Sequence, residues 1–284
     1  MDIKRVLVTN DDGVSAPGIR WLAKAAHESG FDVVVAAPQR EASGMSAALS
    51  AVTEEGGIVV ADAALCGLDD VPAYGVAASP GYIAVLAGLG AFGPAPDLVL
   101  SGINRGANAG RAILHSGTVG AALTAANNGI SALAVSLDVL SPATDSSATD
   151  SSATGSSATG GAAIAELDSV DDETRHWETA AELAGRLLHW LVEAPAGTVL
   201  NLNVPDRPVE EVAGLRRATL APFGQVQMAL AEAGEGYVRT AIREHSARHV
   251  PGTDLAWLAQ GYAVVSAIRP PNLDSQVEVP VDLS

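Results

Sequence analysis

The sequence contains few cysteine and aromatic residues and no long hydrophobic run. Cys66 is the single cysteine among the 284 residues, so no disulfide can form within the chain, which fits a reducing compartment. The longest apolar stretch, residues 82–92, is too short and too rich in glycine to cross a bilayer. No secretion signal precedes the first strand-like segment. These absences predict a cytoplasmic protein with no membrane partner.

Basic residues are also scarce. The chain carries 16 Lys and Arg residues against 33 Asp and Glu residues, which gives a formal net charge of −17. A field of this sign repels nucleic-acid polymers and anionic membranes, so no nucleic-acid partner is expected. It does not exclude a small phosphate ester, because a bound cation can reverse the local potential.

Apolar residues of all kinds make up 48% of the chain but aromatic residues only 4%, so we expect a core of Ala, Val, Leu and Ile. Short apolar runs that suit buried strands alternate with segments that suit helices. This order predicts an α/β fold with a three-layer, Rossmann-like, mostly parallel sheet and helices on both faces. The expected strands are residues 6–8, 33–36, 97–100, 132–135, 199–204 and 263–268, and the expected helices are residues 17–29, 116–127 and 173–193.

A segment of different composition interrupts the second half of the chain. Residues 141–163 repeat Thr-Asp-Ser-Ser-Ala and then the same unit with Gly in place of Asp. Such a tract has little to bury, so we expect a disordered loop. The predicted organisation is an α/β core with the site (1–138), a low-complexity loop (139–165), the remainder of the core (166–205), and a C-terminal extension of short strands that is a candidate oligomerisation element (206–284).

Two adjacent carboxylates, Asp11 and Asp12, follow the first expected strand in the sequence Asn10-Asp11-Asp12-Gly13. Two such charges repel each other, and a hard divalent cation with oxygen ligands relieves the repulsion. A turn or helix-capping role is the alternative, and it is common for Asp. Because ligands bind at the carboxyl ends of the strands in such sheets, we expect this pair to lie near other residues that follow strands.

Two further segments at the same edge carry groups that suit a phosphate. Residues 101–108, SGINRGAN, combine small residues with two Asn amides that can reach a metal or a phosphate. Residues 116–118, Ser-Gly-Thr, open an expected helix, and helix amino termini bind phosphate through free amides. A flexible surface loop and an ordinary helix cap are the respective alternatives.

Motifs of other enzyme classes are missing. Residues 13–20 have the glycine spacing of a P-loop but lack its Lys and its Ser or Thr, which argues against a nucleoside triphosphatase. No Gly-x-Gly-x-x-Gly follows the first strand, and no Gly-x-Ser-x-Gly elbow is present. A dinucleotide-binding fold and a serine hydrolase are therefore poorly supported.

Taken together, these segments resemble the SurE family of nucleotidases. Several independent motifs in the same order are more specific than any one of them. The matching stretches are residues 6–13, 16–19, 37–44 (APQREASG), 101–108 (SGINRGAN), 116–122 (SGTVGAA) and, more weakly, 201–205 (NLNVP).

The resemblance implies a divalent-metal-dependent phosphoric monoester hydrolase. Its substrates would be nucleoside 5′-monophosphates, with 3′-monophosphates as a second option, and its products nucleoside and phosphate. One Mg²⁺ or Mn²⁺ ion is implied, held by Asp11, Asp12, Ser43 and Asn104, with Asp11 and Asp12 also as the catalytic residues. The family further implies a homodimer or a homotetramer.

For the phosphate group we expect contacts from four residues at the same edge. The side chains of Asn108 and Ser116 and the backbone amides of Gly117 and Thr118 would stabilise the negative charge that develops on the phosphoryl oxygens. The leaving nucleoside oxygen would take its proton from solvent or from His115.

The chain departs from the family pattern at several positions. Ala47 stands where a His is usual, Tyr82 where an Asp is usual, His115 where a Tyr is usual, and Thr124 where an acidic residue is usual. The first two departures motivate an alternative function, a nucleotide- or phosphate-binding protein that has lost turnover. A phosphoryl or glycosyl transferase on the same sheet is a third hypothesis.

Overall fold

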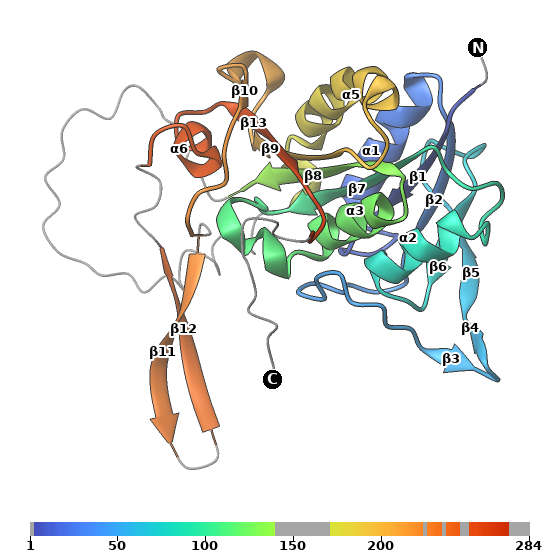
Figure 1. Cartoon of the computed structure of the whole chain (residues 1–284), viewed down its shortest axis with the longest axis horizontal. Coiled ribbons are helices and arrows are strands. Elements are labelled where there is room, and N and C mark those ends of the chain that lie inside the picture. Colours follow the sequence, from blue (N-terminus) through green and yellow to red (C-terminus); the bar gives the residue numbers. More distant parts are fainter. Residues whose placement is uncertain (1–2, 140–170, 224–225, 235–236, 245–249, 273–284) are drawn as a thin grey trace, which may run out of the picture.

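The computed structural model describes residues 3–139, 171–223, 226–234, 237–244 and 250–272 (Figure 1). Apart from its first residue, the expected low-complexity loop over residues 139–165 lies outside the described residues. Within the described part, no helix has the length and the apolar character needed to cross a membrane.

A nine-stranded sheet forms the centre of the protein, in the order β10-β13-β9-β8-β7-β1-β2-β6-β5. Neighbouring strands from β9 through β6 all run parallel, whereas β13 runs antiparallel to β9 and β5 antiparallel to β6. The strands span Arg5–Thr9 (β1), Asp32–Pro38 (β2), Val60–Ala63 (β5), Ala73–Val76 (β6), Leu98–Arg105 (β7), Ser131–Asp138 (β8), Val199–Pro205 (β9), Leu215–Arg217 (β10) and Ala263–Ile268 (β13).

Helices cover both faces of this sheet, and successive residues of β1 show why its sequence is continuously apolar. Val6 and Val8 pack into the core beneath α1 and α5, whereas Leu7 packs into the core beneath α2 and α3. A strand buried on both faces has no polar side to alternate with. The predicted three-layer α/β fold is confirmed. The helices span Pro17–Glu28 (α1), Pro80–Gly88 (α2), Gly117–Asn127 (α3) and Trp177–Glu193 (α5).

Several elements differ from the sequence-based expectation. Strand β7 continues to Arg105, so the first half of SGINRGAN belongs to the sheet and not to a loop, and its register against β8 shifts between Ser101 and Asn104. The helix expected from residue 173 begins at Trp177, after a short 3-10 turn over Asp172–Thr174. Helix α2 was not expected, because its sequence is an apolar stretch without a clear helical pattern.

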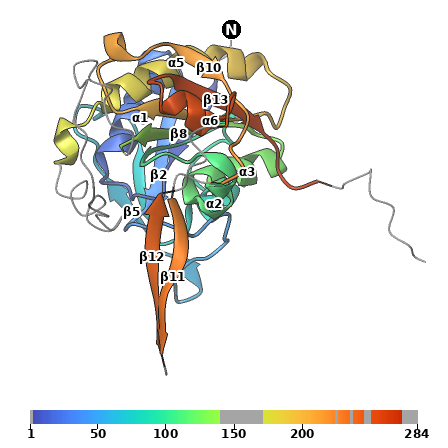
Figure 2. The same ribbon diagram turned by 90° about the vertical axis from the view of Figure 1, so that its left-hand side faces the viewer.

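The C-terminal region contributes to the central sheet as well as forming an extension. Strand β13 pairs with β9, and β10 pairs with β13, so the sheet crosses the predicted boundary at residue 206. In the described part of the C-terminal region, the hairpin of β11 (Val226–Gly234) and β12 (Tyr237–Glu244) forms a sheet of its own, and it projects from the body of the protein (Figures 1 and 2). The remaining small elements are β3 (Thr53–Glu54), β4 (Gly57–Ile58), the 3-10 turns Gly110–His115 (η1) and Val209–Glu211 (η3), and α6 (Asp254–Leu258).

Candidate active site

The turn after β1 is closed by Asn10, which directs the two following carboxylates into a cavity. The buried Asn10 side chain donates from Nδ2 to the Gly13 carbonyl oxygen at 2.9 Å and accepts from the Gly13 amide at 3.1 Å. Gly13 has φ of 101°, a conformation that other residues rarely adopt. Asn10 and Gly13 therefore have the structural role in this motif, which leaves both Asp side chains for other contacts.

Asp11 packs against the amino terminus of α3. Its Oδ1 accepts a 2.5 Å hydrogen bond from the Thr118 hydroxyl, and a Cβ atom at Gly117 would lie 2.7 Å from its Oδ2. Burial raises the pKa of the Asp11 carboxyl, although the Thr118 hydroxyl and the backbone amides of Thr118 and Gly117 act in the opposite direction. The helix terminus thus partly offsets the cost of burying this carboxylate.

Asp12 lies beside Asp11, and its ionised form is also disfavoured. Its Oδ2 accepts a hydrogen bond from the Arg105 amide at 3.3 Å. Burial, and next the neighbouring Asp11 carboxylate, raise the pKa of the Asp12 carboxyl to about 7. The Asp11 carboxylate therefore disfavours ionisation of the partly buried Asp12, and a cation between the two would relieve this repulsion.

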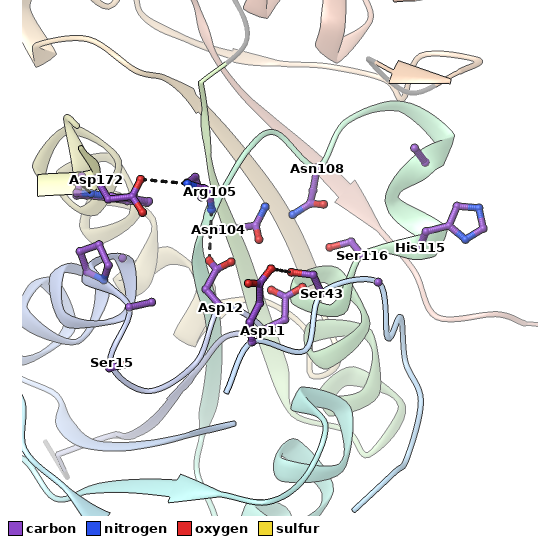
Figure 3. A pocket seen from close by; sticks show the side chains of 17 residues that line it. Asp11, Asp12, Ser15, Ser43, Asn104, Arg105, Asn108, His115, Ser116 and Asp172 are labelled. Carbon is purple, nitrogen blue, oxygen red and sulfur yellow. Dashed lines mark hydrogen bonds and ion pairs between the residues drawn. The ribbon is translucent and has the colours of Figure 1, made fainter. Parts of the chain in front are cut away.

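Both carboxylates open into a cavity of about 560 Å³ at the carboxyl edge of the sheet (Figure 3). The segments that follow β1, β2 and β7 meet here, as the parallel topology requires. The lining residues are Asp11, Asp12, Ser15, Ala16, Pro17, Gly18, Glu41, Ser43, Gly44, Asn104, Arg105, Asn108, Ala112, His115, Ser116, Asp172 and Trp177.

The structure brings the two neutral members of the predicted ligand set to the same cavity. Ser43 donates its hydroxyl hydrogen to Glu41 at 2.7 Å, which leaves its oxygen able to accept or to ligate. Asn104 donates from Nδ2 to the Gly106 carbonyl oxygen at 2.7 Å, so its amide oxygen is the end available to a cation. Together with Asp11 and Asp12 they form an all-oxygen donor set.

This donor set suits a hard divalent cation. Within the described residues, no group of three or more His, Cys, Asp and Glu side chains that could hold a metal is found. A site here would therefore rest on two carboxylates, neutral protein oxygens and water. Mg²⁺ is commonly bound through one or two carboxylates with several waters retained, so two carboxylates are sufficient.

The four predicted phosphate contacts divide into two pairs. Asn108 and Ser116 line the cavity, whereas Gly117 and Thr118 do not. In this structure the amides of Gly117 and Thr118 favour the ionised form of the Asp11 carboxyl. Their expected contact with phosphate stays a prediction. Ser116 caps α3 by accepting from the Val119 amide at 3.0 Å, which leaves its hydroxyl hydrogen for a ligand.

Asn108 is held in place by two asparagines of β9. The Nδ2 atoms of Asn201 and Asn203 donate to the Asn108 carbonyl oxygen at 2.8 Å and 2.9 Å. The Asn108 side chain donates from Nδ2 to the Ser136 hydroxyl at 2.9 Å, and a second N–H of the same group remains for the cavity. The weak NLNVP motif therefore supports the site from beneath.

Sequence reasoning missed several residues that line the cavity. Glu41 and Asp172 add carboxylates, Arg105 adds a guanidinium, and Trp177 adds an apolar wall. Glu41 and Arg105 each lie inside a motif that matches the family, but the sequence analysis gave neither of them a role in the site. Asp172 and Trp177 follow the low-complexity segment, and no local pattern connects them to the edge of the sheet.

The departures at Ala47 and Tyr82 lie outside the lining of this cavity. Residues 46–48 instead pack between α2 and α3, where Cβ atoms at Gly81 or Gly120 would meet their backbone. His115 lines the cavity, but Figure 3 shows its imidazole directed away from Asp11 and Asp12.

The fold and the site define an α/β protein with a carboxylate-bearing ligand cavity at the carboxyl edge of a parallel sheet. Residues 6–227 match the family model described as "Survival protein SurE". The chain belongs to this SurE family.

Relatives and a solved structure agree with this membership. The chain is 32% identical over 276 residues to the 5′/3′-nucleotidase SurE of Shigella dysenteriae, covering 93% of this chain and 90% of the relative. It is 33% identical over 270 residues to the 5′/3′-nucleotidase SurE of Edwardsiella ictaluri, covering 93% and 89%. The crystal structure of SurE from Aquifex aeolicus is similar, with a TM-score of 0.67, 25% identity and 96% of each chain covered.

Proposed function

We propose that this protein is a divalent-metal-dependent nucleotidase that hydrolyses nucleoside 5′-monophosphates, and as a second option 3′-monophosphates, to nucleoside and phosphate. The observation that carries the proposal is the adjacent pair of the buried Asp11 and the partly buried Asp12. Both have raised pKa values and both face a cavity that also presents Asn108 and Ser116. Relatives named 5′/3′-nucleotidases support the substrate class.

One Mg²⁺ or Mn²⁺ ion would be held by Asp11, Asp12, Ser43 and Asn104. Such a cation, when bound, supplies positive charge that polarises phosphoryl oxygens and makes water more acidic. Its binding is favoured because it relieves the repulsion between the two carboxylates. The same charge keeps both carboxylates ionised, so each can accept a hydrogen bond from an attacking water and orient it.

The remaining groups of the cavity suit the phosphate. The Ser116 hydroxyl and the second Nδ2 hydrogen of Asn108 can each donate to a phosphoryl oxygen. Asn201 and Asn203 fix the backbone of Asn108, so its donor is positioned before the substrate binds. Preorganised donors of this kind contribute more to a transition state than donors that must first be ordered.

Phosphate release from nucleoside monophosphates tests this proposal. Activity should disappear after dialysis against EDTA and return with Mn²⁺ or Mg²⁺, whereas Zn²⁺ chelators of low affinity for both Mg²⁺ and Mn²⁺ should leave it intact. Full activity after exhaustive EDTA dialysis would contradict the metal site. Nucleotide binding without product would support the binding-protein alternative, and phosphate transferred to an acceptor other than water would support the transferase.

We also propose that the chain works as a homodimer or homotetramer. The hairpin β11–β12 forms a sheet of only two strands that projects from the body (Figure 2). An isolated two-stranded hairpin is marginally stable in water, so pairing with another copy would stabilise it. Sedimentation of the intact chain and of a variant without residues 226–244 tests this role, since the shortened chain should sediment as a smaller species.

A further inference from the structure

The charges that line the cavity are unbalanced toward the acidic side. Four carboxyl side chains line it, those of Asp11, Asp12, Glu41 and Asp172. Among the described residues, Arg105 is the one Lys or Arg side chain that does so. A single divalent cation would leave little positive charge for a phosphate dianion, because the carboxylates use most of it. A second cationic group is therefore needed where the phosphate binds.

Arg105 is the residue in position to supply that charge. It ends β7 next to Asn104, and its backbone amide contacts Asp12 at 3.3 Å. Its guanidinium extends along the cavity toward Asp172, with Nη1 3.6 Å from Asp172 Oδ1 (Figure 3). More than a third of each of these two side chains is exposed, so the pair lies at the mouth of the cavity and not in the core.

The contact between Arg105 and Asp172 can be given up at little cost. Asp172 Oδ1 also accepts from Nε of the buried Arg175 at 2.8 Å, and Arg175 in turn contacts Asp206 at 3.3 Å. Asp172 therefore keeps its shorter ion pair when Arg105 moves. Solvent-exposed ion pairs at longer distances contribute little to stability.

We propose that Arg105 binds the phosphate group of the substrate, and that Asp172 holds its guanidinium at the mouth of the cavity until phosphate takes the place of the carboxylate. The planar guanidinium presents paired N–H donors that match two phosphate oxygens. Without phosphate the Asp172 carboxylate is the partner of this guanidinium, and phosphate competes with it for Arg105. This inference rests on the proposed function and names the residue that recognises the phosphate.

The test compares Arg105→Gln with Arg20→Gln. Arg20 contacts Glu173 at 3.8 Å, next to Asp172 in the chain, but does not line the cavity, so it controls for the loss of one positive charge on this side of the protein. With saturating Mn²⁺, Arg105→Gln should raise KM for a nucleoside monophosphate about tenfold to a hundredfold, since it deletes charge-assisted hydrogen bonds. Arg20→Gln should leave KM unchanged, and Arg105→Lys should recover part of the loss.

Two further measurements separate phosphate recognition from other effects. The inhibition constant of inorganic phosphate should rise by the same factor as KM in Arg105→Gln, whereas inhibition by the nucleoside should not change. The Mn²⁺ concentration that half-maximally shifts the melting temperature should stay within about twofold of wild type, because Arg105 is not a metal ligand. A change in Mn²⁺ dependence equal to the change in KM would overturn the proposal.

Asp172→Asn tests whether the ion pair itself is what matters. If the pair only braces the structure, Asp172→Asn and Arg105→Gln should raise KM equally. If Arg105 contacts phosphate, Asp172→Asn should leave KM unchanged or lower it, since it removes a carboxylate from the cavity. Melting curves check that both variants fold.

Calorimetry keeps this inference separate from the proposed function. Binding of inorganic phosphate to the Mn²⁺-loaded protein should be at least about tenfold weaker in Arg105→Gln than in wild type, whether or not wild type hydrolyses nucleotides. If the wild type hydrolyses nucleotides and Arg105→Gln has the same KM and the same phosphate affinity, only the proposed role of Arg105 is overturned. A wild type with neither hydrolysis nor phosphate binding overturns both proposals.

Discussion

Replacing Asp12 with asparagine should stabilise the metal-free protein above pH 7 and remove most of its activity. In the folded protein the pKa of Asp12 is raised to about 7, against 3.8 for an unperturbed Asp. The shift corresponds to roughly 4 kcal/mol of folding free energy lost when the group is ionised, at about 1.4 kcal/mol per pKa unit. Asparagine is neutral, so the variant avoids this cost and keeps an oxygen for the Arg105 amide.

The size of the effect depends on pH in a defined direction. Because the folded pKa is the higher one, the folded protein takes up a proton on Asp12 as the pH falls through 7, and the cost of ionisation fades toward pH 4. The advantage of Asp12→Asn should therefore be greatest near pH 8, at up to about 4 kcal/mol, and fall to roughly 2 kcal/mol at pH 5.

Thermal melts in EDTA at pH 5 and pH 8 measure this difference. In a chain of this size, about 1 kcal/mol shifts the melting temperature by about 2 °C, so a rise of up to about 8 °C is expected at pH 8 and roughly half of that at pH 5. The exposed Asp69 gives the matched control, because Asp69→Asn makes the same charge change away from the site. It should leave the melting temperature nearly unchanged.

Addition of Mn²⁺ should reduce the stability advantage of Asp12→Asn. Mn²⁺ at about a hundred times its Kd would stabilise the wild type by about 2.7 kcal/mol, which offsets most of the advantage of about 4 kcal/mol expected for the variant at pH 8. The variant should bind the ion more weakly, because it would lack a charged ligand of the proposed metal site. Turnover should fall by at least about a hundredfold. A lower melting temperature for Asp12→Asn in EDTA at pH 8 would refute the reasoning, since it would show that the carboxylate braces the turn. Wild-type turnover with unchanged Mn²⁺ dependence would refute the site assignment.

Two further substitutions address the site, and a third addresses a buried carboxylate outside it. Gly117→Ala should weaken Mn²⁺ binding in a thermal-shift titration, because the new Cβ would lie 2.7 Å from Asp11 Oδ2 and displace the carboxylate. Asn104→Ala should also weaken Mn²⁺ binding, but less than loss of a carboxylate does, since it withdraws a neutral ligand. Asp254→Ala should lower the free energy of unfolding in urea by about 2–4 kcal/mol, since it leaves buried amides, including that of Gly110 at 2.7 Å, without their acceptor.

The fold was readable from the sequence because its central strands are buried on both faces. Continuous apolar runs such as residues 33–36 have one structural interpretation when helical segments separate them. The edges of the sheet were harder to predict. Strands β5 and β6 have only four residues each and β5 is mostly exposed, and the antiparallel pairing of β13 with β9 depends on contacts across the whole sheet.

The site was readable where residues that suit a ligand follow strands directly. Asp11 and Asp12 end the first strand, and parallel topology places them near Asn104, Asn108 and Ser116 without any knowledge of side-chain contacts. What the sequence could not indicate is how the polar groups are shared. The sequence does not tell whether the backbone amide of a given residue is unpaired or stabilises a carboxylate. Only the structure shows this.

The shared contacts of Asp11 change how the helix motif should be understood. The Thr118 hydroxyl reaches Asp11 across 107 residues of sequence, and the amides of Gly117 and Thr118 also favour its ionised form. The positive end of α3 thus acts on the carboxylate, and in the proposed function the direct donors to phosphate would be the side chains of Asn108 and Ser116. If the amino terminus of α3 bound phosphate directly, Gly117→Ala would first lower the affinity for phosphate. If the helix terminus instead acts through Asp11, Gly117→Ala should first lower the affinity for Mn²⁺, and the affinity for phosphate only as a consequence.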